Sequence, residues 1–266
     1  AVIITGESAV KKNAKIVLEK LSEFAGEFVV STAGPDLESI IAGKGSGAQQ
    51  YSTDKSCVVA NMDIGGGTTN IVIFDNGEVI SKGCFDIGGR LIKIDKSGTV
   101  IYVSPKAAIV ARDMGIDLQV KEGISAEDLS VLTDRMNNVL EQTVGLSPKD
   151  ELNEKLRTAG GSILELPKSI DYIFFSGGVA DYIYHDKNED LFPYGDIGVF
   201  LGQSIKNGKI TRHIKACKPK ETICATVVGA GAYTTSISGS TITYTADIFP
   251  VKNVPVLVLN NKFAED

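Results

Sequence analysis

The chain has 266 residues, of which 43% are apolar and 23% charged, a composition typical of a globular protein with a substantial core. Its net charge of −6 and the absence of any apolar run near the roughly 20 residues that cross a bilayer exclude nucleic acid and membrane as expected partners. The four cysteines lie far apart without a Cys-x-x-Cys motif, which favours reduced thiols in a cytoplasmic protein and argues against a zinc site.

The first part of the chain alternates apolar runs with amphipathic stretches. Ala1–Thr5 and Phe28–Thr32 are predicted strands, and Glu7–Ala25 between them has the periodicity of a helix. Pro35 starts a second helix, whose later part, Glu38–Gln49, is rich in small residues and can pack closely against another helix. Because the chain opens on a strand without a methionine, we expect it to be part of a longer protein.

Short strands separated by tight turns follow. The turns at Asn76-Gly77 and Lys96-Ser97-Gly98 are typical of hairpins, so the sequence predicts an antiparallel meander. Its expected strands are Cys57–Asp63, Thr69–Asp75, Glu78–Asp86, Arg90–Asp95 and Thr99–Val103.

Helices and further strands are predicted in the remainder of the chain. A capping box at Ser125 begins a helix that reaches about Val144. Ser169–Phe175 is predicted to be a buried strand, and two terminal strands are expected near the end of the chain. The other predicted segments are helices at Pro105–Met114, Pro148–Arg157, Asp196–Lys206 and Thr222–Ala232 and the terminal strands at Ser240–Ala246 and Val254–Leu259. The sequence therefore predicts an α/β fold with a mixed sheet and flanking helices.

The turn between the first two meander strands carries the strongest chemical signal. Three successive glycines let the backbone approach a phosphate closely and direct N–H groups towards it, and two threonines add hydroxyl donors. Asp63, just before the bend, is expected to hold Mg²⁺ through water or to orient an attacking water. The alternative is a glycine hairpin without a ligand. The expected phosphate contacts are Gly65, Gly66, Gly67, Thr68 and Thr69.

Two more glycine motifs lie downstream. Gly177 and Gly178 follow a buried strand, where they either pass close to a nucleoside ring or form an ordinary tight turn. Gly229 and Gly231 lie in a segment of small residues, which favours a close helix crossing over a ligand contact.

The order of these elements resembles the actin/Hsp70/sugar-kinase ATPase superfamily, whose fold is actin-like and related to ribonuclease H. In this resemblance Asp63–Thr69 matches the second phosphate loop and Ser176–Val179 matches the adenosine motif. Glu38–Gln49 and Thr222–Ala232 match the helices that connect the two lobes. The first phosphate loop has no match, so we expect the N-terminal part of the family fold to be missing.

The resemblance implies a division into lobes. Residues 1–50 would be the remainder of the first lobe with a connecting helix. Residues 51–232 would form the second lobe with the phosphate and adenosine motifs, and residues 233–266 would return to the first lobe.

Longer strings narrow the resemblance. Ile4–Ala14, Ala33–Gly45, Phe85–Arg90 and Pro250–Val256 are similar to the EutA family, the reactivating factor of ethanolamine ammonia-lyase. The resemblance implies a chaperone-like protein that uses ATP and Mg²⁺, binds inactivated lyase with its damaged cobalamin, and drives release of that cobalamin so that adenosylcobalamin can enter. It also implies a cytoplasmic location, with association with a bacterial microcompartment and homo-oligomerisation left open. ATP hydrolysis is expected of the full-length protein and is undecided for this chain.

Several single residues allow two interpretations. Glu7 follows a strand at a turn, where it either orients a catalytic water or is an ordinary acid in the first turn of a helix. Asp86 and Arg90 either line the rim of the cleft or pair with each other. His185 and His213 are expected at the surface, and neither has Cys, Asp or Glu residues around it at metal-ligand spacing, which argues against axial ligation of cobalamin. A small-molecule kinase and an actin-like filament protein remain alternative functions within the superfamily.

Overall fold

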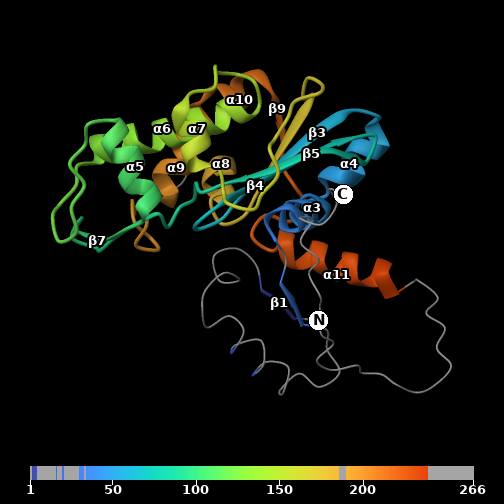
Figure 1. Ribbon diagram of the computed structural model, residues 1–266, viewed down its shortest axis with the longest axis horizontal. Coiled ribbons are helices and arrows are strands. Elements are labelled where there is room, and N and C mark those ends of the chain that lie inside the picture. Colours follow the sequence, from blue (N-terminus) through green and yellow to red (C-terminus); the bar gives the residue numbers. More distant parts are fainter. Residues whose placement is uncertain are drawn as a thin grey trace, which may run out of the picture.

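The computed structural model describes residues 2–4, 16, 20, 30–32, 34–185 and 190–238 (Figure 1). The predicted helix Glu7–Ala25 is described only at Ile16 and Lys20, both of them helical. The predicted terminal strands Ser240–Ala246 and Val254–Leu259 lie outside the described residues.

The main sheet is mixed, as predicted, and has five strands in the order β5-β4-β3-β8-β9. Its first three strands form an antiparallel meander, while β8 runs parallel to β3 and β9 runs parallel to β8. The sequence analysis missed β9, which is too short for a clear alternating pattern. The strands are β3 (Val58–Ile64), β4 (Thr69–Asp75), β5 (Glu78–Phe85), β8 (Tyr172–Ser176) and β9 (Lys215–Cys217).

The predicted continuation of the meander into two further strands of the same sheet is wrong. β6 (Ile92–Ile94) and β7 (Val100–Val103) form a separate antiparallel pair. The chain leaves the main sheet after β5, because the Asp86 N–H donates to the carbonyl of Leu156 rather than to a neighbouring strand. A third pair consists of β1 (Val2–Ile4) and β2 (Val30–Thr32), which run parallel.

Helices cover both faces of the main sheet (Figure 1). Ala60, Met62 and Ile64 of β3 are fully buried in the larger core with the helices from α5 to α10. The alternate residue Val59 lies in a smaller core with Phe74, beneath α4 and the adjoining α3. This alternation is the expected consequence of a strand buried on both sides. The helices are α3 (Pro35–Gly45), α4 (Ala48–Lys55), α5 (Pro105–Asp113), α6 (Ala126–Thr143), α7 (Glu151–Leu156), α8 (Ala180–Tyr184), α9 (Gly198–Asn207), α10 (Lys209–His213) and α11 (Ala225–Ser238).

The predicted helix over Glu38–Gln49 is in fact two helices. α3 ends at Gly45 and α4 begins at Ala48, and Gly47 between them has a φ of +88°, a conformation that favours glycine. The prediction failed because small residues alone do not reveal where a helix turns.

The small residues of α3 and α11 allow these two helices to cross closely, as predicted. A Cβ on Gly45 would overlap the backbone carbonyl of Ala225, and a Cβ on Gly229 would overlap the carbonyl of Ile41. Both glycines are therefore required by backbone contact at the crossing, which lies below the sheet in Figure 1.

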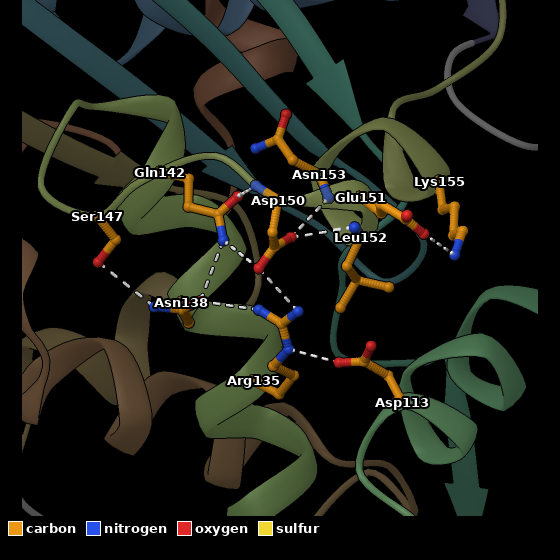
Figure 2. Close-up of polar contacts among 10 residues, drawn as sticks. All are labelled: Asp113, Arg135, Asn138, Gln142, Ser147, Asp150, Glu151, Leu152, Asn153 and Lys155. Carbon is orange, nitrogen blue, oxygen red and sulfur yellow. Dashed lines mark hydrogen bonds and ion pairs between the residues drawn. The ribbon is translucent and has the colours of Figure 1, made fainter.

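A polar cluster around Arg135 joins α5, α6 and α7 (Figure 2). The Arg135 guanidinium contacts Asp113 at 2.7 Å, the side-chain oxygen of Asn138 at 2.8 Å and Asp150 at 2.9 Å. Asp150 also caps α7 by accepting the N–H of Leu152 at 3.0 Å. Partial burial by itself raises the pKa of Asp150, but hydrogen bonds from Gln142 and Arg135 outweigh it and the pKa is lowered.

Candidate functional site

The glycine turn is a two-residue hairpin tip between β3 and β4. The N–H of Gly65 donates to the carbonyl of Thr68 at 2.9 Å, which places Gly66 and Gly67 at the tip. Within the described part of the chain, the N–H groups of Gly66, Gly67 and Thr68 meet no acceptor. Three neighbouring donors therefore remain at the tip of the turn, and the phosphate contact that the sequence predicts for them stays a prediction.

The loop after β5 holds the glycine turn by its carbonyl groups. The N–H of Gly89 donates to the carbonyl of Gly65 at 3.0 Å, and the N–H of Arg90 donates to that of Gly66 at 2.6 Å. A Cβ on Gly88 would lie 2.5 Å from the carbonyl oxygen of Gly66 and 2.7 Å from that of Gly65. The two loops thus approach so closely that only glycine fits at position 88.

The second glycine motif lies at the same end of the sheet as the first. β3 and β8 are parallel and pair Asp63 with Ser176, so the residues that follow both strands leave the sheet side by side. The N–H of Val179 donates to the carbonyl of Ile64 at 3.1 Å. Gly177 has a φ of +83° and contacts the same backbone, since its Cβ would lie 2.6 Å from the carbonyl carbon of Ile64.

A cavity of about 370 Å³ lies between these two motifs. Gly65 and Gly66 line it from the turn, and Gly178 and Val179 line it from the second motif. An added Cβ on Gly178 would meet nothing within 4 Å, so this glycine leaves room beside the cavity. The remaining lining residues are Gly89, Arg90, Asp181, Tyr182, Tyr194, Asp196, Gly198 and Ile223.

Most of the remaining lining residues were missed by the sequence analysis. Asp181 and Tyr182 directly follow the second motif, so their position in the first turn of α8 was a usable signal. Tyr194 and Asp196 come from a loop before α9 that no pattern connects with either motif. The pKa of Tyr182 is raised to about 12, first by burial and then by the neighbouring Asp196 carboxylate.

The Asp63 carboxylate points to the sheet face covered by α3 and α11 and is not part of the cavity lining. It is 6% exposed and accepts hydrogen bonds from Ser176 Oγ at 2.6 Å and Thr226 Oγ1 at 3.3 Å. Burial raises the pKa of Asp63, and the two hydroxyl donors oppose that effect.

Two buried amides lie next to Asp63 on the same sheet face. Asn70 pairs with Asp63 across the β3–β4 ladder, and Asn61 is two residues earlier on β3. Both side-chain oxygens, Asn61 Oδ1 and Asn70 Oδ1, are buried and have no hydrogen-bond partner within the described residues. Unsatisfied buried oxygens are unusual in folded proteins.

The other predicted phosphate contacts differ in their surroundings. The Thr69 hydroxyl is fully buried and donates to the carbonyl of Ile87 at 2.8 Å. Gly67 and Thr68 are half-buried at the tip of the turn but do not line the cavity. Glu7 lies outside the described residues.

Asp86 and Arg90 do not pair with each other. Arg90 contacts Asp196 at 3.3 Å and lines the cavity, whereas Asp86 contacts Lys106 at 3.0 Å and accepts the Thr158 hydroxyl at 2.6 Å. Of the two, Arg90 therefore lines the cavity, and Asp86 does not.

His185 and His213 are exposed, as predicted. In the part of the chain that the structure describes, no three His, Cys, Asp or Glu side chains gather in a way that could hold a metal ion. The same part contains no helix with both the length and the apolar character of a membrane span.

Comparison with known proteins identifies the family. The family model described as ethanolamine utilisation protein EutA matches residues 1–266. The chain belongs to the EutA family. It is 38% identical over 261 residues to the ethanolamine ammonia-lyase reactivase EutA of Salmonella typhimurium, and equally identical to that of Escherichia coli. Each alignment covers 97% of this chain and 54% of the relative, so the chain spans about half the length of these EutA relatives.

A solved structure confirms the predicted fold of this EutA chain. The Ppx/GppA family member of Aquifex aeolicus superposes with a TM-score of 0.50 at 13% identity, covering 88% of this chain and 74% of that protein. The EutA chain therefore has the actin-like fold that the order of its glycine motifs predicted.

Proposed function

We propose that this chain provides the nucleotide-binding lobe of an ATP-dependent factor that reactivates ethanolamine ammonia-lyase. The observation that supports the proposal is the cavity between the glycine turn and Gly178, in a chain whose EutA relatives carry the name of lyase reactivase. The fold brings together two motifs that are more than 100 residues apart, as a nucleotide with a phosphate end and a nucleoside end requires.

In this proposal the glycine turn binds the β- and γ-phosphates. The N–H groups of Gly66, Gly67 and Thr68 donate to phosphate oxygens, and Gly65 closes the turn by donating its N–H to the carbonyl of Thr68. Thr69 supports the turn from behind through its hydroxyl bond to Ile87.

The nucleoside lies against the second motif. Gly177 keeps the chain close to β3 by its positive φ, and Gly178 leaves open space on the cavity side. Glu7 remains the candidate for orienting the attacking water.

The residues around Asp63 fit a Mg²⁺ ion. Mg²⁺ prefers oxygen ligands and keeps several waters when it binds with phosphates, so a cage of three carboxylates is not required. Asp63 offers a carboxylate, and the unpartnered oxygens of Asn61 and Asn70 lie on the same sheet face. When bound, Mg²⁺ would neutralise charge on the phosphates. Asp63 would hold its water shell, and a nearby cation would oppose the effect of burial on the Asp63 pKa.

The α3–α11 crossing is the element through which nucleotide would act on the lyase. Thr226 in the first turn of α11 contacts Asp63, so a change at Asp63 on nucleotide binding would act directly on this helix. ATP would favour one arrangement of the lobes, and inactivated lyase would bind differently in each arrangement. Release of the damaged cobalamin would follow from that difference in affinity.

The test is recovery of activity by cyanocobalamin-inactivated ethanolamine ammonia-lyase. Full-length protein, ATP, Mg²⁺ and adenosylcobalamin are added, and lyase turnover is followed. We expect recovery that needs ATP and disappears with Asp63→Ala and with the isosteric Asp63→Asn. Asp117→Asn, at an exposed carboxylate, is the matched control and should leave recovery unchanged.

Three results would contradict the proposal. Recovery without ATP would remove the role of the nucleotide, and full recovery with Asp63→Asn would remove the role of that carboxylate. Phosphoryl transfer to a metabolite without any recovery would favour a kinase instead.

A further inference from the structure

Arg90 lies directly on the glycine turn. Its N–H donates to the carbonyl of Gly66 at 2.6 Å. Its side chain extends along the same residue, since a Cβ on Gly66 would lie 3.2 Å from Arg90 Cδ and 3.4 Å from Arg90 Cβ. The backbone and the first side-chain carbons of Arg90 therefore lie beside the part of the turn that carries the free N–H donors.

A single carboxylate positions the guanidinium. Asp196 Oδ2 contacts Arg90 Nε at 3.3 Å, while Asp196 Oδ1 accepts the N–H of Gly198 at 2.9 Å. Asp196 is buried, whereas the Arg90 side chain is 61% exposed at the cavity. The contact uses only Nε, and neither terminal nitrogen of Arg90 meets an acceptor within the described residues.

The charged side chains that line the cavity bear on how it could take a phosphate chain. Among the described residues that line it, Arg90 is the one basic side chain, and Asp181 and Asp196 are acidic. A phosphate chain carries several negative charges that these carboxylates repel. The two terminal nitrogens of an arginine match two phosphate oxygens in a bidentate contact, which a lysine cannot reproduce.

We propose that Arg90 binds the phosphate chain of the nucleotide through its two terminal nitrogens, and that Asp196 is the positioning residue that holds it over the glycine turn. This inference rests on the proposed function and specifies its ligand class. The site selects nucleoside polyphosphates over nucleosides, because the arginine contact exists only where phosphates are present.

The experiment compares Mg·ATP with adenosine by isothermal titration calorimetry on the full-length protein. We expect Arg90→Gln to weaken Mg·ATP binding by about 10- to 100-fold, the usual effect of losing hydrogen bonds to a charged group. Adenosine binding should change by less than about twofold, because adenosine does not reach the guanidinium. Arg90→Lys keeps the positive charge but loses the two terminal nitrogens of the guanidinium. Its affinity for Mg·ATP should fall between those of wild type and Arg90→Gln.

Two further variants separate local from general effects. Arg212→Gln removes the same charge from an exposed position on α10 and should leave both ligands unchanged. Asp196→Asn should weaken Mg·ATP by less than Arg90→Gln does and leave adenosine unchanged. Replacing a residue that only stabilised the fold would change the affinity for both ligands. The ratio of the Mg·ATP and adenosine affinities therefore isolates the positioning role.

The outcomes are distinguishable. If wild type binds neither Mg·ATP nor adenosine, the proposed function fails, and the inference fails with it. If wild type binds Mg·ATP and Arg90→Gln binds it equally well, only the inference is overturned. An equal loss of both ligands in Arg90→Gln would also overturn it, because the arginine would then act through the fold rather than on the phosphates.

Discussion

Replacing Gly88 by alanine tests whether the loop after β5 shapes the glycine turn. The added Cβ would lie 2.5 Å from the carbonyl oxygen of Gly66 and 2.7 Å from that of Gly65. Both atoms belong to backbone that is held on both sides, so neither can rotate away as a flexible side chain would. One of the two loops must move.

The expected cost follows from this geometry. Forcing a methyl group into a packed site costs about 1–3 kcal/mol. The movement also weakens the bonds from Gly89 and Arg90 to the turn, which measure 3.0 and 2.6 Å. Each contributes about 1 kcal/mol. Alanine also lowers the conformational entropy of the unfolded chain, which stabilises the folded protein by about 0.5 kcal/mol. We expect a net destabilisation of about 2–4 kcal/mol, accompanied by loss of ATP affinity.

Urea unfolding and ATP titration of the same variant measure both effects. The matched control is Gly123→Ala, where an added Cβ meets nothing within 4 Å. It should change the free energy of unfolding by less than about 0.5 kcal/mol and leave ATP binding unaltered. A Gly88→Ala protein with wild-type stability and wild-type ATP affinity would refute the reasoning, because the turn would then not depend on the contact.

Three further predictions test the cavity, the helix crossing and the polar cluster. Gly178→Ala adds a methyl group beside the cavity without a clash, so ATP affinity should fall in a titration while the urea midpoint stays constant. Gly229→Ala overlaps backbone of α3 and should cost about 1–3 kcal/mol in urea unfolding, whereas Gly231→Ala should cost less than about 0.5. The pKa of Asp150 is lowered in the folded protein, so its stabilising effect is complete above the unfolded value of about 3.9 and is lost as pH falls through the folded value. Asp150→Asn should therefore lower the urea midpoint at pH 7, and this loss should shrink as the pH falls below about 3.9, whereas a loss that stays equal over that range would exclude its ion pair with Arg135 as the cause.

Local chemistry made parts of the fold predictable. Asn76-Gly77 connects two strands as a hairpin, and Ser125 caps α6 by accepting the N–H of Asp128 at 3.0 Å. Such signals depend on a few neighbouring residues, so they can be recognised in the sequence without knowledge of the tertiary structure. The break at Gly47 and the separation of β6 from the main sheet were not predictable, because both depend on what the segment packs against.

The site divides in the same way. The three glycines of the turn indicate a backbone that can approach an anion, and this property follows from the residue types alone. The surroundings of Asp63 are different, because Ser176 and Thr226 come from distant segments and reach it only once β8 and α11 are in place. Its burial, and with it the direction of its pKa shift, belongs to the tertiary structure.

The sequence by itself determined the family and the two glycine motifs, because each rests on residues in unbroken strings, and it indicated the actin-like fold through the order of these motifs along the chain. Only the tertiary structure placed the motifs at one end of parallel strands and brought Arg90 and Asp196 together across about 100 residues of chain. The physical reason is that a cavity is defined by surfaces from separate segments, and their distance in space depends on how the whole core packs.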